Sequence, residues 1–424
     1  MDPSSATTLA RNGLRLVPVD TNDEEAFTEW LQADSRGFYE SAPSQERLAQ
    51  ARDHQGLHRL EGVYDDTVPH STPVGTVSTW LTGLTLPGHT SADSWAISSV
   101  TVAPTHRRRG IATALLEGEL RTAHSLGLPL AILTVSESVI YGRWGFGPAT
   151  FATSWSIDTK RSRWSGGETP GQLSFTDPDS YRQTAKKVLN TVSTARAGEI
   201  SMELDPGAAE GLIGPLKDVD DAGKHRLVRY DSPENVPEGF IHYSVEERTD
   251  FAQHLVEVHY LAATSDQALR ALWRFVIELD LVSEVRATLR ACDEPLRELV
   301  SDMRGAHTTA VEDHLWVRIL DVPAALTARR YESDGEIVLN VTDAQQIANG
   351  RFQLTVVNGS ARVVPATDEA DIDLPVSALG SILLGHPLTQ NLALSGKIAG
   401  TAEAVAALDR LFRTAVPPHL SVWF

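Results

Sequence analysis

The stretch VTVAPTHRRRGIAT, residues 100–113, decides how the first third of this chain folds. It places three arginines and a glycine between a strand-like apolar run, 95–103, and an amphipathic run. After Arg109 the apolar side chains recur with the 3.6-residue period of a helix, and Gly127 ends that pattern as a C-cap. The next run, 128–135, is continuously apolar, as a buried strand is. The sequence therefore predicts a strand, a loop, a helix and a second strand, which is one βαβ unit.

The loop in this unit has the features of a phosphate site. The free N–H groups of a first helical turn and the helix dipole favour an anion. Gly110 lets the backbone approach a ligand closely, and Arg107, Arg108 and Arg109 add positive charge and forked donors. Residues 104–125 carry a net charge of +2 in a chain whose net charge is −19. The Walker A and Rossmann glycine patterns are absent, and the alternative is a solvated basic loop that only caps a helix.

Composition limits the class of protein. A length of 424 residues predicts two or three domains, and 42% apolar with 22% charged residues is typical of globular chains. The net charge of −19 argues against general nucleic-acid binding and would attract cationic small molecules. Cys292 is the single cysteine, which excludes an intramolecular disulfide and a cysteine-ligated metal site. We expect no signal peptide, no membrane span and a cytoplasmic location, with secretion lacking a classical signal left open.

The rest of the chain reads as alternating helices and strands without an internal repeat. An acidic helical region spans 23–55 and begins at a cap near Asp23. A polar stretch rich in glycine and serine, 160–172, is interpreted as a linker, and another boundary is expected near 304–313. Further strands are expected at 62–64, 73–81, 240–245, 254–262, 336–341, 352–357 and 361–364, and further helices at 268–279, 375–384 and 402–414.

Several motifs resemble known acetyltransferases. Arg107-x-x-Gly110-x-Ala112 resembles the pyrophosphate loop of the GNAT superfamily, in which a tyrosine follows the next strand, as Tyr141 does here. The segments VAPTHRRRG (102–110), IYGRWGFGPAT (140–150) and VRILDVPAALTAR (317–329), with a final phenylalanine, resemble the enhanced intracellular survival (Eis) family of bacterial N-acetyltransferases.

This resemblance implies a fold and an activity. It implies an α/β (α+β) chain with a catalytic GNAT domain at 1–158, a degenerate GNAT-like domain at 159–310 and a sterol-carrier-like domain at 311–424. The middle segment contains no second Gln/Arg-x-x-Gly-x-Gly/Ala pattern, which agrees with the degenerate assignment. The resemblance also implies acetyl-CoA as cosubstrate, no metal, a homohexamer, and direct acetyl transfer to a primary amine of a cationic acceptor. That acceptor would be an aminoglycoside-like polyamine or a lysine side chain.

The resemblance assigns roles to individual residues. Tyr141 would be the general acid for the CoA thiolate, since a phenol and a thiol have similar unperturbed pKa values. The C-terminal carboxylate of Phe424 would be the general base. Glu40 and Trp423 would contact the acceptor, and Trp423 stands where the family pattern has an acid. The residues expected to bind the cofactor are Val100, Thr101, Val102, Arg107, Arg108, Arg109, Gly110, Ile111, Ala112, Thr113, Ser136 and Glu137.

Other interpretations remain at this stage. Tyr141 is also compatible with a core tyrosine whose hydroxyl is satisfied, and an apolar C-terminus with a packed tail. A lipid or hydrophobic-ligand carrier that uses the C-terminal domain is the alternative of a different class. That carrier leaves the loop between Arg107 and Ala112 unexplained. A third possibility is an acetyl-CoA sensor without turnover, against which Tyr141 argues.

Overall fold

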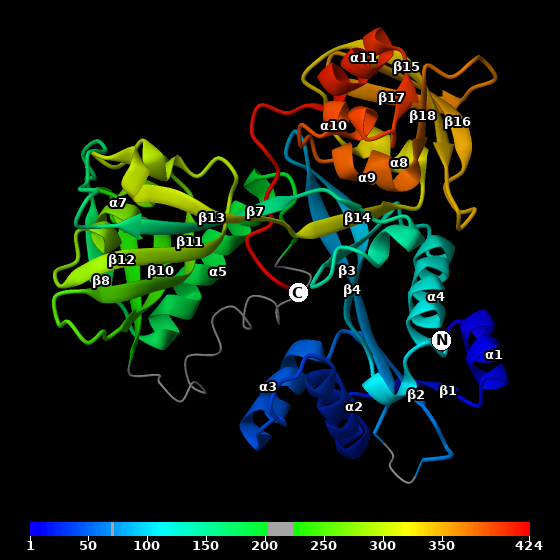
Figure 1. Cartoon of the computed structure of the whole chain (residues 1–424), viewed down its shortest axis with the longest axis horizontal. Coiled ribbons are helices and arrows are strands. Elements are labelled where there is room, and N and C mark those ends of the chain that lie inside the picture. The colour runs from blue at the N-terminus through cyan, green and yellow to red at the C-terminus, as the bar shows by residue number, and fades with distance from the viewer. Residues whose placement is uncertain (69–71, 202–223) are drawn as a thin grey trace. The chain divides into compact units, whose positions relative to one another are not determined.

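The chain folds into two compact units. The structure is a computed structural model that describes residues 1–68, 72–201 and 224–424 (Figure 1). The first unit comprises residues 1–149, 315–414 and 424, and the second comprises 150–314 and 415–423. Among the described residues, no helix combines the length and the apolar character that crossing a membrane requires.

The first unit contains a seven-stranded sheet in which the expected βαβ unit is present. Its strands lie in the order β1-β2-β3-β4-β5-β14-β6, and β4 and β5 are parallel neighbours joined by the helix α4 (Ile111–Ser125). All other neighbours in this sheet pair antiparallel. The strands are β1 (Arg15–Val19), β2 (Arg59–Tyr64), β3 (Gly75–Leu86), β4 (Thr90–Val102), β5 (Leu130–Thr134), β14 (Leu315–Ile319) and β6 (Gly147–Pro148).

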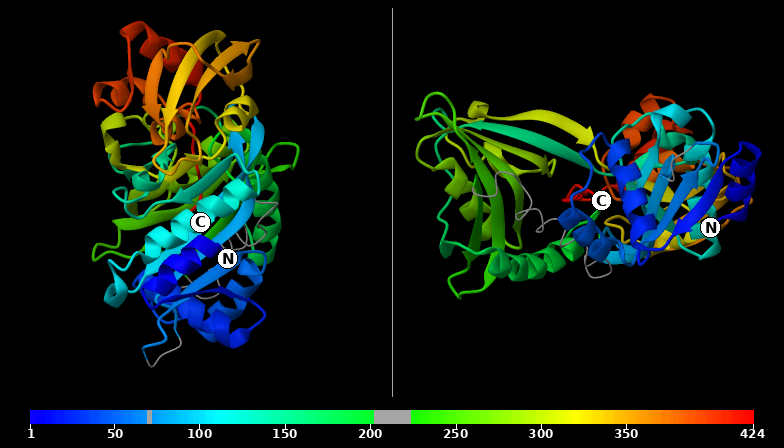
Figure 2. Two further views of the ribbon diagram at one scale, coloured as in Figure 1. Left: turned by 90° about the vertical axis from the view of Figure 1, so that its right-hand side faces the viewer. Right: turned by 90° about the horizontal axis from the view of Figure 1, so that it is seen from below.

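Helices cover both faces of this sheet. On one face α1 (Pro3–Arg11) lies alongside α4 (Ile111–Ser125), as Figure 2 shows, and both bury leucines in one core. On the other face α2 (Glu24–Gly37) and α3 (Gln45–Gln55) enclose a separate core. The Asp23 side chain caps α2, as predicted, by accepting from the N–H of Ala26. The single helical region expected at 23–55 is two helices, because Pro43 lies in the intervening segment and has no N–H to donate.

A second, five-stranded sheet in the first unit has the order β17-β16-β15-β18-β19. Arg329, the last residue of the VRILDVPAALTAR segment, is buried. Its guanidinium group donates hydrogen bonds to the carbonyls of Leu383 and Phe412 and so connects the helices beside this sheet. The elements are α8 (Val322–Ala328), β15 (Gly335–Thr342), β16 (Gly350–Val357), β17 (Ser360–Pro365), β18 (Ile372–Pro375), α9 (Val376–Ile382), α10 (Thr389–Leu394), β19 (Ala399–Gly400) and α11 (Ala402–Phe412).

The second unit is built on a seven-stranded sheet in the order β13-β7-β12-β11-β10-β9-β8. The helix α7 (Asp266–Ile277) packs on the face that carries Ile241, and α5 (Pro178–Ala195) packs on the opposite face, where Tyr181 contacts Phe240. The strands are β7 (Phe151–Asp158), β8 (Gln172–Phe175), β9 (His225–Asp231), β10 (Pro237–Glu246), β11 (His254–Ala263), β12 (Val282–Arg290) and β13 (Ala306–Asp313), with short 3-10 helices η5 (Pro295–Arg297) and η6 (Met303–Gly305).

Two strands lie across the expected domain limits. Residues 151–158, placed in the N-terminal segment from sequence, form β7 and pair with β12 and β13 of the second sheet. Residues 315–319 form β14 and pair with β5 and β6 of the first sheet. The region 304–313, expected as a boundary, contains the continuous strand β13. The limits 1–158, 159–310 and 311–424 stay predictions, because hydrophobic periodicity identifies a strand without identifying its partner.

Candidate active site

The parallel strands β4 and β5 separate at their carboxyl ends. Their pairing ends at Ala96 and Ile132. A β-bulge follows in β4, where Ser99 has a φ of 53° and its carbonyl accepts from Thr76 Oγ1 at 2.8 Å. A bulge bends its strand, so the backbone edge of residues 100–102 that faces β5 has no strand partner among the described residues. An open edge of this kind can receive an extended ligand by strand addition, as expected for Val100, Thr101 and Val102.

The start of α4 offers free backbone donors. Gly110 is the N-cap residue in a left-handed conformation with a φ of 78°, and no side chain caps the helix. No acceptor within the described part of the chain reaches the N–H groups of Ile111, Ala112 and Thr113. Arg108 is also left-handed, with a φ of 65°. Free N–H groups and a helix dipole directed at one point are the elements of an anion site.

The three arginines of this loop have different surroundings. Arg107 and Arg108 are exposed, and neither forms an ion pair within the described residues. Arg109 instead donates to Asp65 Oδ2 at 2.7 Å and to the Asn12 carbonyl at 2.8 Å. Hydrogen bonds from Thr67 and then from Arg109 hold the pKa of the Asp65 carboxyl well below its usual range. Arg109 therefore fastens the loop to the end of β2, which leaves Arg107 and Arg108 as the available cations.

The phosphate loop gives a first testable prediction. We expect Arg108→Gln to raise KM for acetyl-CoA about 10–100-fold, because one charged hydrogen bond contributes about 1.5–3 kcal/mol. Gly110→Ala should act in the same direction through backbone strain alone, since an added Cβ at its φ of 78° would meet no atom within 4 Å. Steady-state kinetics and calorimetric titration with acetyl-CoA measure both effects. Exposed Arg362→Gln in β17 is the matched control, and unchanged donor affinity in Arg108→Gln would move the phosphate site elsewhere.

Tyr141 begins a short 3-10 helix, η2 (Tyr141–Trp144), after β5. Its ring is buried against Trp144 and Phe146, with centroid distances of 6.3 and 6.4 Å. Its hydroxyl hydrogen-bonds to no described residue. Burial, with a smaller contribution from the charge of Glu137, raises the pKa of Tyr141. The phenol therefore keeps its proton at neutral pH, as a proton donor must, while Ser136 and Glu137 lie exposed just beyond β5.

The C-terminal residue returns to the first unit at the end of β5. A terminal oxygen of Phe424 accepts a hydrogen bond from Thr134 Oγ1 at 2.7 Å. The Phe424 ring packs edge-on against Trp80 of β3, with centroids 5.5 Å apart. The His58 ring stacks on the same indole, with centroids 4.2 Å apart. The carbonyl oxygen of Phe424 therefore lies at the carboxyl end of β5, where β4 and β5 have separated.

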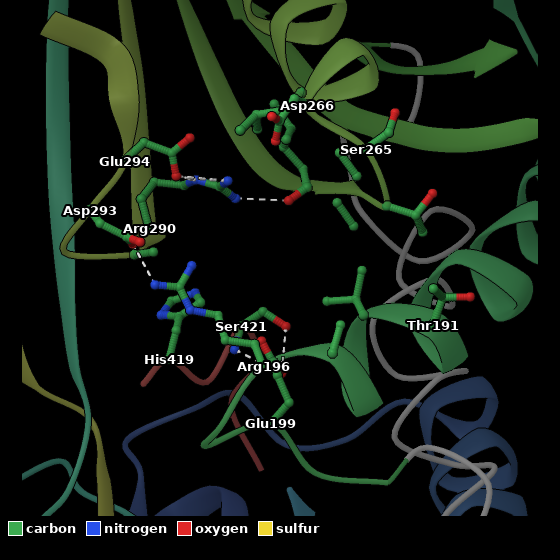
Figure 3. A pocket seen from close by; sticks show the side chains of 18 of the residues that line it. Thr191, Arg196, Glu199, Ser265, Asp266, Arg290, Asp293, Glu294, His419 and Ser421 are labelled. Carbon is green, nitrogen blue, oxygen red and sulfur yellow. Dashed lines mark hydrogen bonds and ion pairs between the residues drawn. The ribbon is translucent and has the colours of Figure 1, made fainter. Parts of the chain in front are cut away.

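The residues before Phe424 are anchored within the second unit. One of them, Ser421, lines a cavity of about 410 Å³ in that unit. Ser421 and Glu199, both labelled in Figure 3, face each other there. Ser421 N and Oγ donate to Glu199 Oε2 at 3.2 and 3.0 Å. The His314 ring hydrogen-bonds to the Val422 carbonyl at 2.7 Å. Trp423 contacts the His314 ring and is 59% exposed, so its expected contact with an acceptor stays a prediction.

Glu199 makes the anchoring of this segment dependent on pH. Burial raises the pKa of Glu199 from 4.5 to about 7. A raised folded-state pKa adds stability below pH 4.5 that is lost as the pH rises through 7, by at most about 3 kcal/mol. We expect Glu199→Gln to remove this component, so that the parent loses more unfolding free energy than the variant between pH 4.5 and 8. Chemical denaturation across that range measures it, and parallel curves would contradict the assignment.

The half-buried carboxyl group of Asp34 is a candidate site residue that the sequence analysis does not identify. Burial raises its pKa to about 7, opposed by a hydrogen bond from Ser99 at the bulge of β4. Its Oδ1 is buried without a hydrogen-bond partner among the described residues. Asp34 continues the buried stripe of α2 that includes Phe27 and Trp30, and an acid in an apolar stripe was the available signal. The predicted acceptor residue Glu40 is exposed and paired with Arg47 at 2.5 Å.

Comparisons with known proteins cover most of the chain. Residues 19–149 and 212–319 each match an acetyltransferase (GNAT) domain, and residues 322–421 match a sterol carrier protein domain. An uncharacterized N-acetyltransferase of Streptomyces avermitilis is 33% identical over 404 residues, 93% of this chain and 96% of that protein. N-acetyltransferase Eis of Mycobacterium tuberculosis is 32% identical over 372 residues, 85% of this chain and 88% of that protein. The crystal structure of Eis1 from Mycobacterium abscessus matches with a TM-score of 0.80 at 28% identity, over 97% of this chain and 100% of that chain. These matches confirm the expected fold class.

Proposed function

Since the chain belongs to the Eis-like N-acetyltransferases of the GNAT superfamily, we propose that it transfers an acetyl group from acetyl-CoA to a primary amine of a cationic acceptor. One observation supports this activity most directly. The helix α4 begins at Gly110 without a side-chain cap, and this start is close in sequence to the free edge of β4. One feature suits a pyrophosphate and the other an extended pantetheine arm.

The residues at this site divide the work of binding and proton transfer. The N–H groups of Ile111, Ala112 and Thr113, with Arg107 and Arg108, would hold the pyrophosphate. Acetyl-CoA supplies an activated acetyl group. The CoA thiolate that leaves when this group is transferred must be protonated. The phenol of Tyr141, kept protonated by burial, is placed after β5 to donate that proton.

The acceptor amine must lose its proton before it attacks. We assign this step to the carboxylate of Phe424, which Thr134 and Trp80 position. Asp34 has the burial and the raised pKa to receive an ammonium group or, in place of Phe424, to accept the proton. Glu40 is already neutralised by Arg47, so we place it at the edge of the acceptor site. A net charge of −19 favours cationic acceptors such as aminoglycoside-like polyamines or lysine side chains.

A thiol-release assay tests the proposed activity. The chain is mixed with acetyl-CoA and, in separate reactions, with polyamines, aminoglycosides, lysine peptides and neutral amines. We expect cationic amines to accelerate thiol release, with the acetylated amine detected by mass spectrometry. The matched control is Gly110→Ala, which should need more acetyl-CoA for the same rate. Thiol release that no amine accelerates would contradict amine acetylation.

A carrier role is the second candidate, because residues 322–421 match a sterol carrier protein domain. Titration with a fluorescent sterol or fatty acid distinguishes it. Carrier binding would be indifferent to Arg108→Gln, whereas acetyl transfer would not. The hexameric assembly and the cytoplasmic location that the family resemblance implies stay predictions.

A further inference from the structure

Three histidines gather in the second unit, and the proposed function uses none of them. His225, His242 and His259 come from the neighbouring strands β9, β10 and β11. One ligand nitrogen from each lies within 4.8 Å of the other two. The centroids of the three rings are 4.8–4.9 Å apart, so the rings surround one point.

The strand register explains why the three side chains share a face. His225 is paired with Ser244, which lies two residues from His242 and therefore on the same side of β10. The register between β10 and β11 shifts after His242. Tyr260 pairs with His242 and Val258 pairs with Tyr243, so His259 has no partner residue in β10 and forms a bulge. A β-bulge re-aims side chains in this way and directs His259 toward the other two rings.

The electrostatic surroundings of His242 and His259 favour the neutral imidazole. Burial, and then the charges of His259 and His225, lower the pKa of His242 to about 3. Burial followed by His225 lowers the pKa of His259. His225 Nδ1 and His242 Nε2 lie 2.7 Å apart, a distance at which one ring must donate and the other accept. Three imidazoles this close together, two of them with lowered pKa values, form a good ligand set for a metal ion.

We propose that His225, His242 and His259 form a binding site for a transition-metal ion of the zinc type, although the family resemblance implies no metal. Zinc binds imidazole nitrogen at about 2.0–2.1 Å, so tetrahedral ligands lie about 3.3 Å apart. The three nitrogens need only small side-chain movements to reach that spacing. Three histidine ligands leave the fourth coordination position of the ion to a water molecule. Water can reach this position because His259 is exposed.

The hydroxyl of Ser244 supports this assignment. Its Oγ lies 2.7 Å from His259 Nε2, and hydrogen bonds of this kind fix the ring orientation of a ligating histidine. The charge of Glu257 also acts on His259 and would compensate part of a divalent charge. A bound ion would tie three strands of one sheet together, so it should stabilise the second unit independently of acetyl transfer.

The test uses the full chain, purified without a polyhistidine tag and treated with a chelator that is then removed. Calorimetry with Zn²⁺ should show one high-affinity site per chain. His259→Ala removes the exposed ligand and His225→Ala a half-buried one, and each should weaken Zn²⁺ binding at least about 10–100-fold. His307→Ala removes an exposed histidine of the same unit as a matched control and should leave this affinity unchanged.

Two further readouts make the outcome decisive. Co²⁺ in place of Zn²⁺ should give the intense visible absorption of a four-coordinate site in the parent and in His307→Ala, and not in the two ligand variants. Zn²⁺ should raise the Tm of the parent and of the control but not of those variants. A parent chain without a high-affinity Zn²⁺ site, or ligand variants that bind Zn²⁺ as the parent does, would overturn the proposal.

Discussion

Replacing Tyr141 by phenylalanine is expected to lower kcat by about 10²–10⁴-fold while KM for acetyl-CoA stays nearly unchanged. The substitution keeps the ring that packs on Trp144 and Phe146 and removes only the hydroxyl. That hydroxyl has no hydrogen-bond partner among the described residues, so its loss should cost little folding stability. A large fall in kcat at an unchanged Tm would therefore report proton donation to the leaving thiolate.

Tyr64→Phe is the matched control, because it makes the same change on a half-buried tyrosine of β2 in the same unit. It should leave kcat within about twofold of the parent value. Single-turnover measurement at several pH values separates the chemical step from product release. A Tyr141→Phe enzyme with parental kcat would show that another group, or water, protonates the thiolate.

The second large effect is expected at the C-terminus. Adding two glycines after Phe424 should lower kcat by more than about 10²-fold, because the carboxylate becomes a neutral amide and the new charge lies out of register. Deleting Phe424 should be similarly harmful, since it moves the carboxylate by about one residue length, ~3.5 Å. Phe424→Ala keeps the carboxylate but loses the contact with Trp80, so it should retain more activity than either.

The order of activity is therefore parent, then Phe424→Ala, then deletion or extension. Phe424→Tyr keeps both the ring and the carboxylate and is the control that should stay close to the parent. Thr134→Val should lower kcat without raising KM for acetyl-CoA, since it removes the hydrogen bond to the terminal oxygen. If the extended chain keeps the parental kcat, Asp34 becomes the leading base, because its half-buried carboxyl has a pKa of about 7 whereas Glu40 is exposed and paired.

Some parts of the site could be predicted because their signal is local. Gly110 stands where a helix begins after a strand, and only the neighbouring residues are needed to recognise that start. Asp23 as a helix cap and Gly127 as a helix end have the same origin, and both are observed. The position of Tyr141 after β5 followed from a family motif of eleven residues.

Other parts could not be predicted because they depend on pairings between distant residues. Arg109 resembled its two neighbours in the sequence, and only its contact with Asp65, 44 residues away, shows that it fastens the loop. Asp34 gains its raised pKa from burial beside Ser99, 65 positions further along the chain. The strands β7 and β14 have ordinary apolar patterns, and their sheet membership was decided by long-range hydrogen bonding.

By itself, the sequence determined the βαβ unit, the phosphate loop, the likeness to one acetyltransferase family and the candidate proton donor, since these follow from spacing within short windows. Tertiary structure alone decided which strands complete each sheet, that Phe424 contacts Thr134 and Trp80, and that His225, His242 and His259 meet. Each of these histidines is 17 residues from the next one in sequence, a spacing that matches no short metal-binding motif. Strand pairing and one β-bulge bring their rings together, because hydrogen bonds between strands act on residues that the sequence keeps apart.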